Sequence, residues 1–133
     1  MIVVDSSALI AIFRQEHDAE DFARRIATDD DPVMSAANLL ETSIVLRGLK
    51  EIAPARAERW LDDFIEAAGI RIEAVTSDQA NAARSAHLQF GKGTGHSAAL
   101  NYGDCFAYAL AKALQAPLLC KGNDFRLTDI AIA

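Results

Sequence analysis

The sequence lacks any long apolar run. No stretch approaches the ~18 consecutive apolar residues that a membrane-spanning helix needs. The N-terminus also lacks the basic segment, apolar segment and small-residue cleavage site of a secretory signal. From these two absences we expect a protein that has no membrane partner and works in the cytoplasm.

Cysteine and basic residues are also scarce. The two cysteines, Cys105 and Cys120, stand among apolar residues without the spacing of metal ligands, which favours buried thiols over a disulfide. Lys and Arg number 13 against 19 Asp and Glu, so the net charge is −6. This balance argues against nucleic acid as a partner, since nucleic-acid-binding proteins usually carry a basic patch. A cation bound among several acids changes the local electric field, so the net charge by itself does not exclude a nucleic-acid partner.

Short apolar strands alternate with helical patterns along almost the whole chain. This alternation predicts an α/β fold, a three-layer α/β/α sandwich with a central, mostly parallel sheet. A length of 133 residues fits one domain, residues 1–133. The expected strands are 2–5, 33–35, 70–75 and 117–122, with a candidate edge strand at 129–133. The expected helices begin after Ser6 or Ser7 and then cover 18–28, 37–49, 54–68, 77–90 and 104–115.

Four acids stand out from the other acidic residues by their surroundings. Asp5 directly follows the apolar strand "IVV", and Asp124 follows the strand "PLLCKG". Glu41 lies in the apolar helix "NLLETSIVL", and Asp104 opens the helix "DCFAYAL". Most other acids lie in mixed-charge segments that are typical of solvated surfaces. Ligands of parallel α/β sheets bind beyond the carboxyl ends of the strands, so we expect Asp5, Asn123 and Asp124 to share one edge.

A cluster of carboxylates needs a counter-charge. A buried carboxylate without a partner tends to take up a proton, and neighbouring carboxylates repel one another. A hard divalent cation such as Mg²⁺ or Mn²⁺ removes both difficulties, because it binds oxygen ligands and often binds substrate phosphates as well. Acids that converge from distant segments therefore predict metal-assisted phosphoryl chemistry, in which the cation activates a water and neutralises charge on the phosphate oxygens.

Each of these acids also has a structural interpretation. Asp5 could cap the first helix, as Ser6 could. Asp104 could interact with the helix dipole from the first turn of its helix. Asp124 could be an ordinary turn residue after a strand. The structural interpretation is weakest for Glu41, because the helix around it is apolar on nearly every face.

Four stretches, taken in chain order, resemble a known family. They are "VVDSSAL", the helix that carries Glu41, "FGKGTGHSAALNYGDCFAYALA" and "LLCKGNDFRLTDI". The resemblance is to PIN-domain proteins, and more closely to the VapC toxins of bacterial toxin–antitoxin modules. It implies a PIN-like α/β/α fold and the activity of a Mg²⁺- or Mn²⁺-dependent ribonuclease, a hydrolase that often cleaves tRNA or rRNA.

The resemblance also implies roles for particular residues. The four family acids, catalytic and metal-binding, fall on Asp5, Glu41, Asp104 and Asp124. We expect Asp5 and Asp104 to contact the metal directly, and the other two acids to complete its ligands directly or through water. Ser6 and Asn123 match polar positions beside the first and fourth acids. We expect these two side chains to hold the carboxylates in place by hydrogen bonds.

Two protein partners are implied as well. A free ribonuclease would poison its host, so the resemblance implies a cognate VapB-like antitoxin. An antitoxin arginine inserted among the carboxylates would pair with them bidentately and displace the metal. VapC-like proteins are usually homodimers, and the helix that carries Trp60 and Phe64 is a candidate contact surface.

One segment departs from the family pattern. After "GKG" the family has a basic residue followed by His-Pro, whereas this chain has "TGHSA". The resemblance therefore does not extend to loop docking or substrate choice. Lys92 and His96 in this loop are candidate contacts to RNA phosphate, with a purely solvated loop as the alternative. Arg47, less than two helical turns after Glu41, is a third candidate.

Three alternative functions compete with a ribonuclease. A receiver-like signalling module would use Asp5 as phosphoacceptor and Lys121 as its strand-end lysine, but position 5 is the wrong place and the usual early acid pair is missing. A dehalogenase-like phosphatase would need D-x-D, and Ser7 stands at the third place. A PIN fold that only binds a partner remains, although four intact acids argue against it.

Overall fold

The computed structural model describes all 133 residues and contains a four-stranded sheet in which every pairing is parallel. The strands are β1 (Ile2–Val4), β2 (Pro32–Ser35), β3 (Arg71–Glu73) and β4 (Leu118–Leu119). Their order across the sheet is β3-β2-β1-β4, so β1 lies between β2 and β4. The predicted parallel sheet is confirmed, and its first strand is internal.

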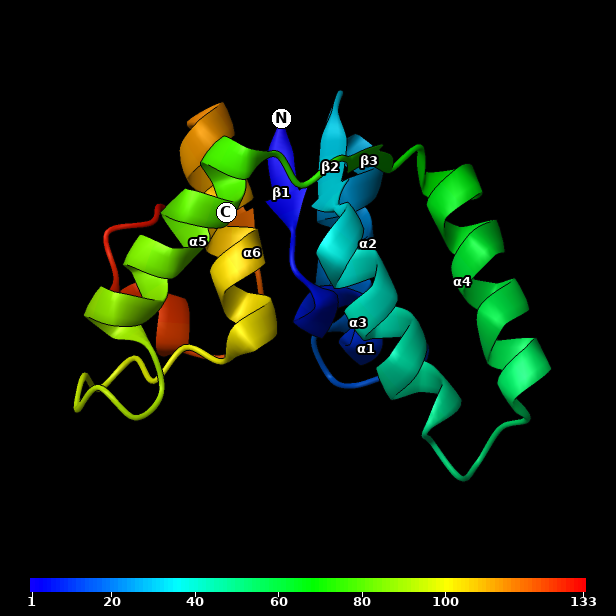
Figure 1. Cartoon of the computed structure of the whole chain (residues 1–133). Helices are drawn as coiled ribbons and strands as arrows, with labels where there is room; N and C mark the ends of the chain where they lie inside the picture. The colour runs from blue at the N-terminus through cyan, green and yellow to red at the C-terminus, as the bar shows by residue number, and fades with distance from the viewer.

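Helices cover both faces of this sheet, as Figure 1 shows. They are α1 (Ser6–Phe13), α2 (Ala19–Thr28), α3 (Ala36–Arg47), α4 (Pro54–Ala68), α5 (Ser77–Phe90) and α6 (Tyr102–Leu114). The helices α5 and α6 pack together on one face, and α1 to α4 lie on the other. The predicted three-layer α/β/α arrangement is therefore confirmed. No helix is both long and apolar enough to cross a membrane.

Local sequence signals explain where the helices begin and end. The side chains of Ser35, Thr76 and Asn101 accept hydrogen bonds from backbone N–H groups in the first turns of α3, α5 and α6. Pro54 opens α4, where its missing N–H is not needed. Gly69 ends that helix with φ +66°, a left-handed conformation that glycine adopts without strain.

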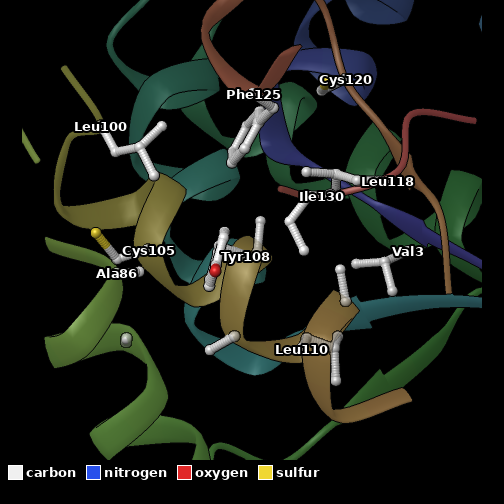
Figure 2. Close-up of a cluster of buried hydrophobic side chains, with 14 of the residues drawn as sticks. Val3, Ala86, Leu100, Cys105, Tyr108, Leu110, Leu118, Cys120, Phe125 and Ile130 are labelled. Carbon is white, nitrogen blue, oxygen red and sulfur yellow. The ribbon is translucent and has the colours of Figure 1, made fainter. Parts of the chain in front are cut away.

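The alternation of side chains along β1 divides the core into two halves. Val3 points toward α5 and α6, and Val4 points toward the other helices; both are 0% exposed. Figure 2 shows the first half, whose buried members include Val3, Leu110, Leu118 and Tyr108. Burial on both faces makes β1 a fully apolar strand up to Val4, and it leaves the next residue at the carboxyl edge of the sheet.

The C-terminal part of the chain differs from the expectation in detail. The strand predicted for 117–122 is regular only at Leu118–Leu119. The candidate edge strand at 129–133 is reduced to a single parallel bridge between Leu118 and Ile132. Between them lies a 3₁₀ helix, η1 (Asp124–Leu127), which the sequence pattern does not indicate. The short β4 ends early because the chain must turn here to bring Phe125 and Ile130 into the core.

Leu110→Ala tests the packing of this core. Leu110 is 0% exposed on α6, so truncation should leave a cavity and lower the free energy of unfolding by about 2–5 kcal/mol. Leu88→Ala is the matched control, since Leu88 is 78% exposed on α5 and its truncation should change stability by about 0.5 kcal/mol or less. Urea denaturation measures both. Equal losses in the two variants would contradict this description of the core.

Candidate active site

Asp5 occupies the point where β1 passes into α1. Its side chain is 3% exposed, and its Oδ2 accepts hydrogen bonds from the Ser7 backbone N–H (3.1 Å) and the Ser7 Oγ (2.6 Å). The other oxygen, Oδ1, is buried and has no hydrogen-bond donor. Burial raises the pKa of Asp5 to about 6, although the Ser7 bonds act in the opposite direction. Asp5 therefore caps α1 with one oxygen and leaves the other unused.

Ser7 connects this carboxylate to the neighbouring strand. Its Oγ donates to Asp5 and accepts the backbone N–H of Lys121 at 2.9 Å. The backbone N–H of Asp5 in turn donates to the Leu119 carbonyl at 2.9 Å. The start of α1 and the end of β4 are thus held together beside the Asp5 carboxylate.

Glu41 reaches the same region from α3. Its Oε1 accepts hydrogen bonds from Ser6 Oγ at 2.5 Å and from Asn38 Nδ2 at 3.1 Å. Asn38 is 0% exposed, and its Nδ2 also donates to the Gly103 carbonyl at 2.9 Å, while its Oδ1 has no partner. The negative charge of Glu41 contributes to the raised pKa of Asp5. These contacts place the Glu41 carboxylate between α1 and the start of α6.

Asp104 lies in the first turn of α6. It forms a reciprocal capping box with Asn101: each side chain accepts the other residue's backbone N–H, at 2.9 and 3.0 Å. Burial is the largest cause of the rise in the pKa of Asp104 to about 7, and the charges of Asp5, Glu41 and Asp124 contribute to the same rise. The other three predicted acids therefore act electrostatically on Asp104, and the structure brings the four into one region.

Asp124 and Asn123 are the most exposed members of this group. Both are exposed, and four residues separate Asp124, which begins η1, from the end of β4. The Asn123 side chain makes no hydrogen bond to any of the carboxylates, in contrast to the expectation for it. Of the two predicted supporting residues, the hydrogen bond predicted for Ser6 is therefore present and that for Asn123 is absent.

No basic side chain neutralises these acids. The ion pairs of the protein involve other carboxylates, and none includes Asp5, Glu41, Asp104 or Asp124. No three His, Cys, Asp or Glu side chains stand close enough to form a complete ligand set for one ion. The arrangement suits a cation that keeps several waters and takes only some of its ligands from protein, which is how Mg²⁺ usually binds.

The candidate RNA contacts lie in different surroundings. Lys92 is exposed in the loop between α5 and α6. His96 packs edge-on against Phe90 with ring centroids 5.0 Å apart, and its Nδ1 accepts the Ala98 backbone N–H at 3.0 Å. Arg47 pairs with Glu58 of α4 at 3.4 Å. His96 therefore supports the loop structurally, and Arg47 already has an acidic partner.

Sequence reasoning missed three residues of this site. Ser7, Asn38 and Gly103 carry no charge, and only contacts between distant segments reveal their positions. A signal exists for Asn38, since it is a polar residue three positions before Glu41 in an apolar helix and such pairs are neighbours on the helix surface. Ser7 stands two residues after a capping aspartate, a usual place for a local hydrogen bond.

The fold and the unpaired acids together assign this protein to a class: parallel α/β/α proteins with an acidic site at the carboxyl edge of the sheet. The comparisons with known proteins narrow the class. Residues 2–131 match the PIN domain, and this chain belongs to that family. Membership removes the receiver-like and dehalogenase-like alternatives.

Curated relatives cover nearly the whole chain. Ribonuclease VapC of Mycolicibacterium smegmatis is 48% identical over 130 residues, with 98% of each chain covered. Ribonuclease VapC28 of Mycobacterium tuberculosis is 47% identical over 129 residues, which cover 97% of this chain and 95% of the relative. The resemblance to VapC proteins that the sequence motifs indicate is therefore confirmed.

Solved structures show the same fold at low sequence identity. VapC20 of Mycobacterium tuberculosis, a sarcin–ricin loop cleaving toxin, superimposes with a TM-score of 0.78 at 17% identity, covering 100% of this chain and 98% of its own. VapBC2 from Rickettsia felis, bound to a DNA fragment from its promoter, gives a TM-score of 0.75 at 15% identity, with 100% and 98% covered. These structures support the fold alone.

The raised pKa values of Asp5 and Asp104 predict how stability depends on pH. Both acids hold a proton more tightly in the folded state than in the unfolded state, so in chelator the stabilisation is complete below about pH 4 and is lost as the pH rises through about 6 and 7. Asp5→Asn should remove the part of this pH dependence that is due to Asp5, about 3 kcal/mol of the free energy of unfolding. Urea denaturation of both proteins between pH 4 and 8, with EDTA, measures the difference. If the free energies of unfolding of the two proteins change with pH in parallel, the prediction is wrong.

Proposed function

We propose that this protein is a divalent-metal-dependent ribonuclease toxin of a VapBC-type toxin–antitoxin system. The carrying observation is the cluster of four carboxylates without a basic partner, in which the buried Asp5 Oδ1 has no donor. A bound cation would give this oxygen a partner, because a buried acceptor without one costs folding free energy. The ribonuclease names of relatives at 47% and 48% identity support the same function.

The residues present fit Mg²⁺ or Mn²⁺. Asp5 and Asp104 would hold the ion directly, and Glu41 and Asp124 would complete the site directly or through water. All four offer only carboxylate oxygens, which both ions prefer. When bound, the ion would supply Lewis-acid chemistry for phosphodiester hydrolysis, lowering the pKa of a water and offsetting phosphate charge.

Neutral side chains of the chain would keep these acids in place. Ser7 orients Asp5, and Ser6 and Asn38 orient Glu41, through the hydrogen bonds described above. Bonds of this kind fix the direction of a carboxylate before a ligand arrives. We propose that Asn123, whose side chain is free, bonds to Asp124 or to substrate once RNA is bound.

RNA would approach from the loop side of the site. Lys92 and His96 remain candidates for phosphate contacts, and Arg47 could exchange its pairing with Glu58 for a phosphate. The RNA cleaved would be a tRNA or an rRNA, and the acidic surface of the chain makes the bound cation important for attracting it. A cytoplasmic location follows from such a substrate.

The partners belong to the same proposal. A VapB-like antitoxin would block the site with an arginine that pairs with the carboxylates. A homodimer is also expected. The candidate dimer surface on α4 already makes contacts within the protein. The ring centroids of Trp60 and Phe64 are stacked 5.1 Å apart, and Trp60 meets Phe13 edge-on at 4.9 Å.

Cleavage of cellular RNA should require Mg²⁺ or Mn²⁺ and stop in EDTA. Asp5→Asn should lower the cleavage rate at least about 100-fold, more than the roughly 10–100-fold that loss of an outer hydrogen-bonding partner costs. Total RNA with mapped cleavage ends, with and without Mn²⁺, gives the readout. Full activity in EDTA would contradict the metal mechanism. A protein that cleaves no RNA under any of these conditions would favour the alternative of a PIN domain that only binds a partner.

The melting temperature provides a control that is independent of RNA. In chelator Asp5→Asn should melt at the same temperature as the parent or higher, since it removes one of several crowded charges. In Mn²⁺ this order should shrink or reverse, because only the parent gains binding free energy from the ion. A purely capping Asp5 predicts no dependence on metal, as Asn caps about as well as Asp.

A short peptide from the neighbouring antitoxin frame should inhibit cleavage through an exposed arginine. The arginine replaces the cation as partner of the carboxylates, so the inhibited protein should also lose Mn²⁺ affinity about tenfold or more. Co-expression and a cleavage assay with the purified peptide measure the effect. If the Arg→Ala peptide inhibits equally well, the blocking mechanism is wrong.

A further inference from the structure

Gly103 occupies a position on α6 where no other residue fits without moving a site carboxylate. It is buried at the second residue of the helix, next to Asp104. A Cβ added here would overlap the Glu41 carboxylate, with Oε1 2.6 Å away and Oε2 and Cδ closer still. Contacts this short do not occur between real side chains, so an alanine at 103 requires the Glu41 carboxylate to leave its place.

The Glu41 carboxylate is anchored in that place from the other side. Ser6 Oγ and Asn38 Nδ2 both donate to its Oε1, at 2.5 and 3.1 Å. Oε2 takes no part in these bonds and faces the space that a Cβ of residue 103 would fill. The carboxylate is therefore pressed against the start of α6 by bonds from α1 and α3.

Asn38 links the two helices that carry the acids. Its Nδ2 bridges Glu41 Oε1 on α3 and the Gly103 carbonyl on α6, the latter at 2.9 Å. The bond to Gly103 is buried, the bond to Glu41 is partly buried, and Asn38 itself is 0% exposed. The distance between the Glu41 and Asp104 carboxylates thus depends on the Asn38 amide and on the absence of a side chain at Gly103.

We infer that Gly103 is a positioning residue of the metal site: its lack of a side chain admits the Glu41 carboxylate beside Asp104, and its carbonyl anchors the Asn38 amide that orients Glu41. The inference rests on the proposed metal-dependent function. It assigns to this glycine a role that backbone conformation does not require, since its φ lies outside the left-handed region that favours glycine.

The test is Gly103→Ala, with Gly48→Ala as matched control. Gly48 follows α3, and a Cβ there would lie 3.4 Å from the Val45 carbonyl, an ordinary contact. Gly103→Ala should remain folded, because the group that must move is the end of a flexible side chain. It should lose Mn²⁺ affinity about 10–100-fold, measured by titration calorimetry and by the electron paramagnetic resonance of free Mn²⁺. Gly48→Ala should bind Mn²⁺ like the parent.

A double substitution isolates the contact from metal and from RNA. With Glu41→Ala the overlap is gone, so Gly103→Ala should raise the melting temperature in chelator by about 2–4 °C through the better helix propensity of alanine. In the parent the same change should raise it clearly less, or lower it. Equal shifts in the two backgrounds, or unchanged Mn²⁺ affinity in Gly103→Ala, would overturn the inference. A parent that binds no Mn²⁺ would instead overturn the proposed function, and the melting shifts would still decide the contact.

Discussion

Repulsion among four carboxylates that have no basic partner is the constraint around which the carboxyl edge of this protein is arranged. Burial and neighbouring charge raise the pKa of Asp104 to about 7, and burial raises that of Asp5 to about 6. A fold selected only for stability would place an arginine or lysine here, as it does for Asp31 and Asp129 elsewhere in the chain. Keeping the acids unpaired lowers stability and would preserve a place for the proposed cation.

The same side chains serve structure and the proposed chemistry with different atoms. Asp5 caps α1 through Oδ2 and leaves Oδ1 without a donor. Asp104 accepts the Asn101 backbone N–H through Oδ2. The structural roles of Asp5 and Asp104 are therefore compatible with the proposed functional ones, because a carboxylate has two oxygens and a helix cap occupies only one. The cap also restrains the carboxylate, so that the remaining oxygen points in a defined direction.

Uncharged residues determine how the acids are held. Ser7 ties Asp5 to the end of β4, and Asn38 ties α3 to α6. The first bond joins a helix to the sheet, and the second joins helices from opposite faces of the sheet at its carboxyl edge. The two helical layers are joined there by polar contacts, whereas elsewhere the sheet separates two apolar half-cores.

Much of this protein follows from the sequence by itself. The alternation of apolar strands and amphipathic helices determines a parallel α/β/α sandwich, and Asp5 and Asp124, which come after strands, indicate the edge where the candidate site lies. Such patterns depend on periodicity and on neighbours in the chain. The apolar surroundings of Glu41 and the position of Asp104 at a helix start single out two further acids, and the structure brings them near Asp5. Tertiary structure alone decided the rest. Ser7, Asn38 and Gly103 matter because of contacts with residues up to 114 positions away, and no local pattern encodes a hydrogen bond across that separation. It also decided that the Asn123 side chain stays free and that the last strand shrinks to one bridge, because packing of Phe125 and Ile130 sets the path of the chain after β4.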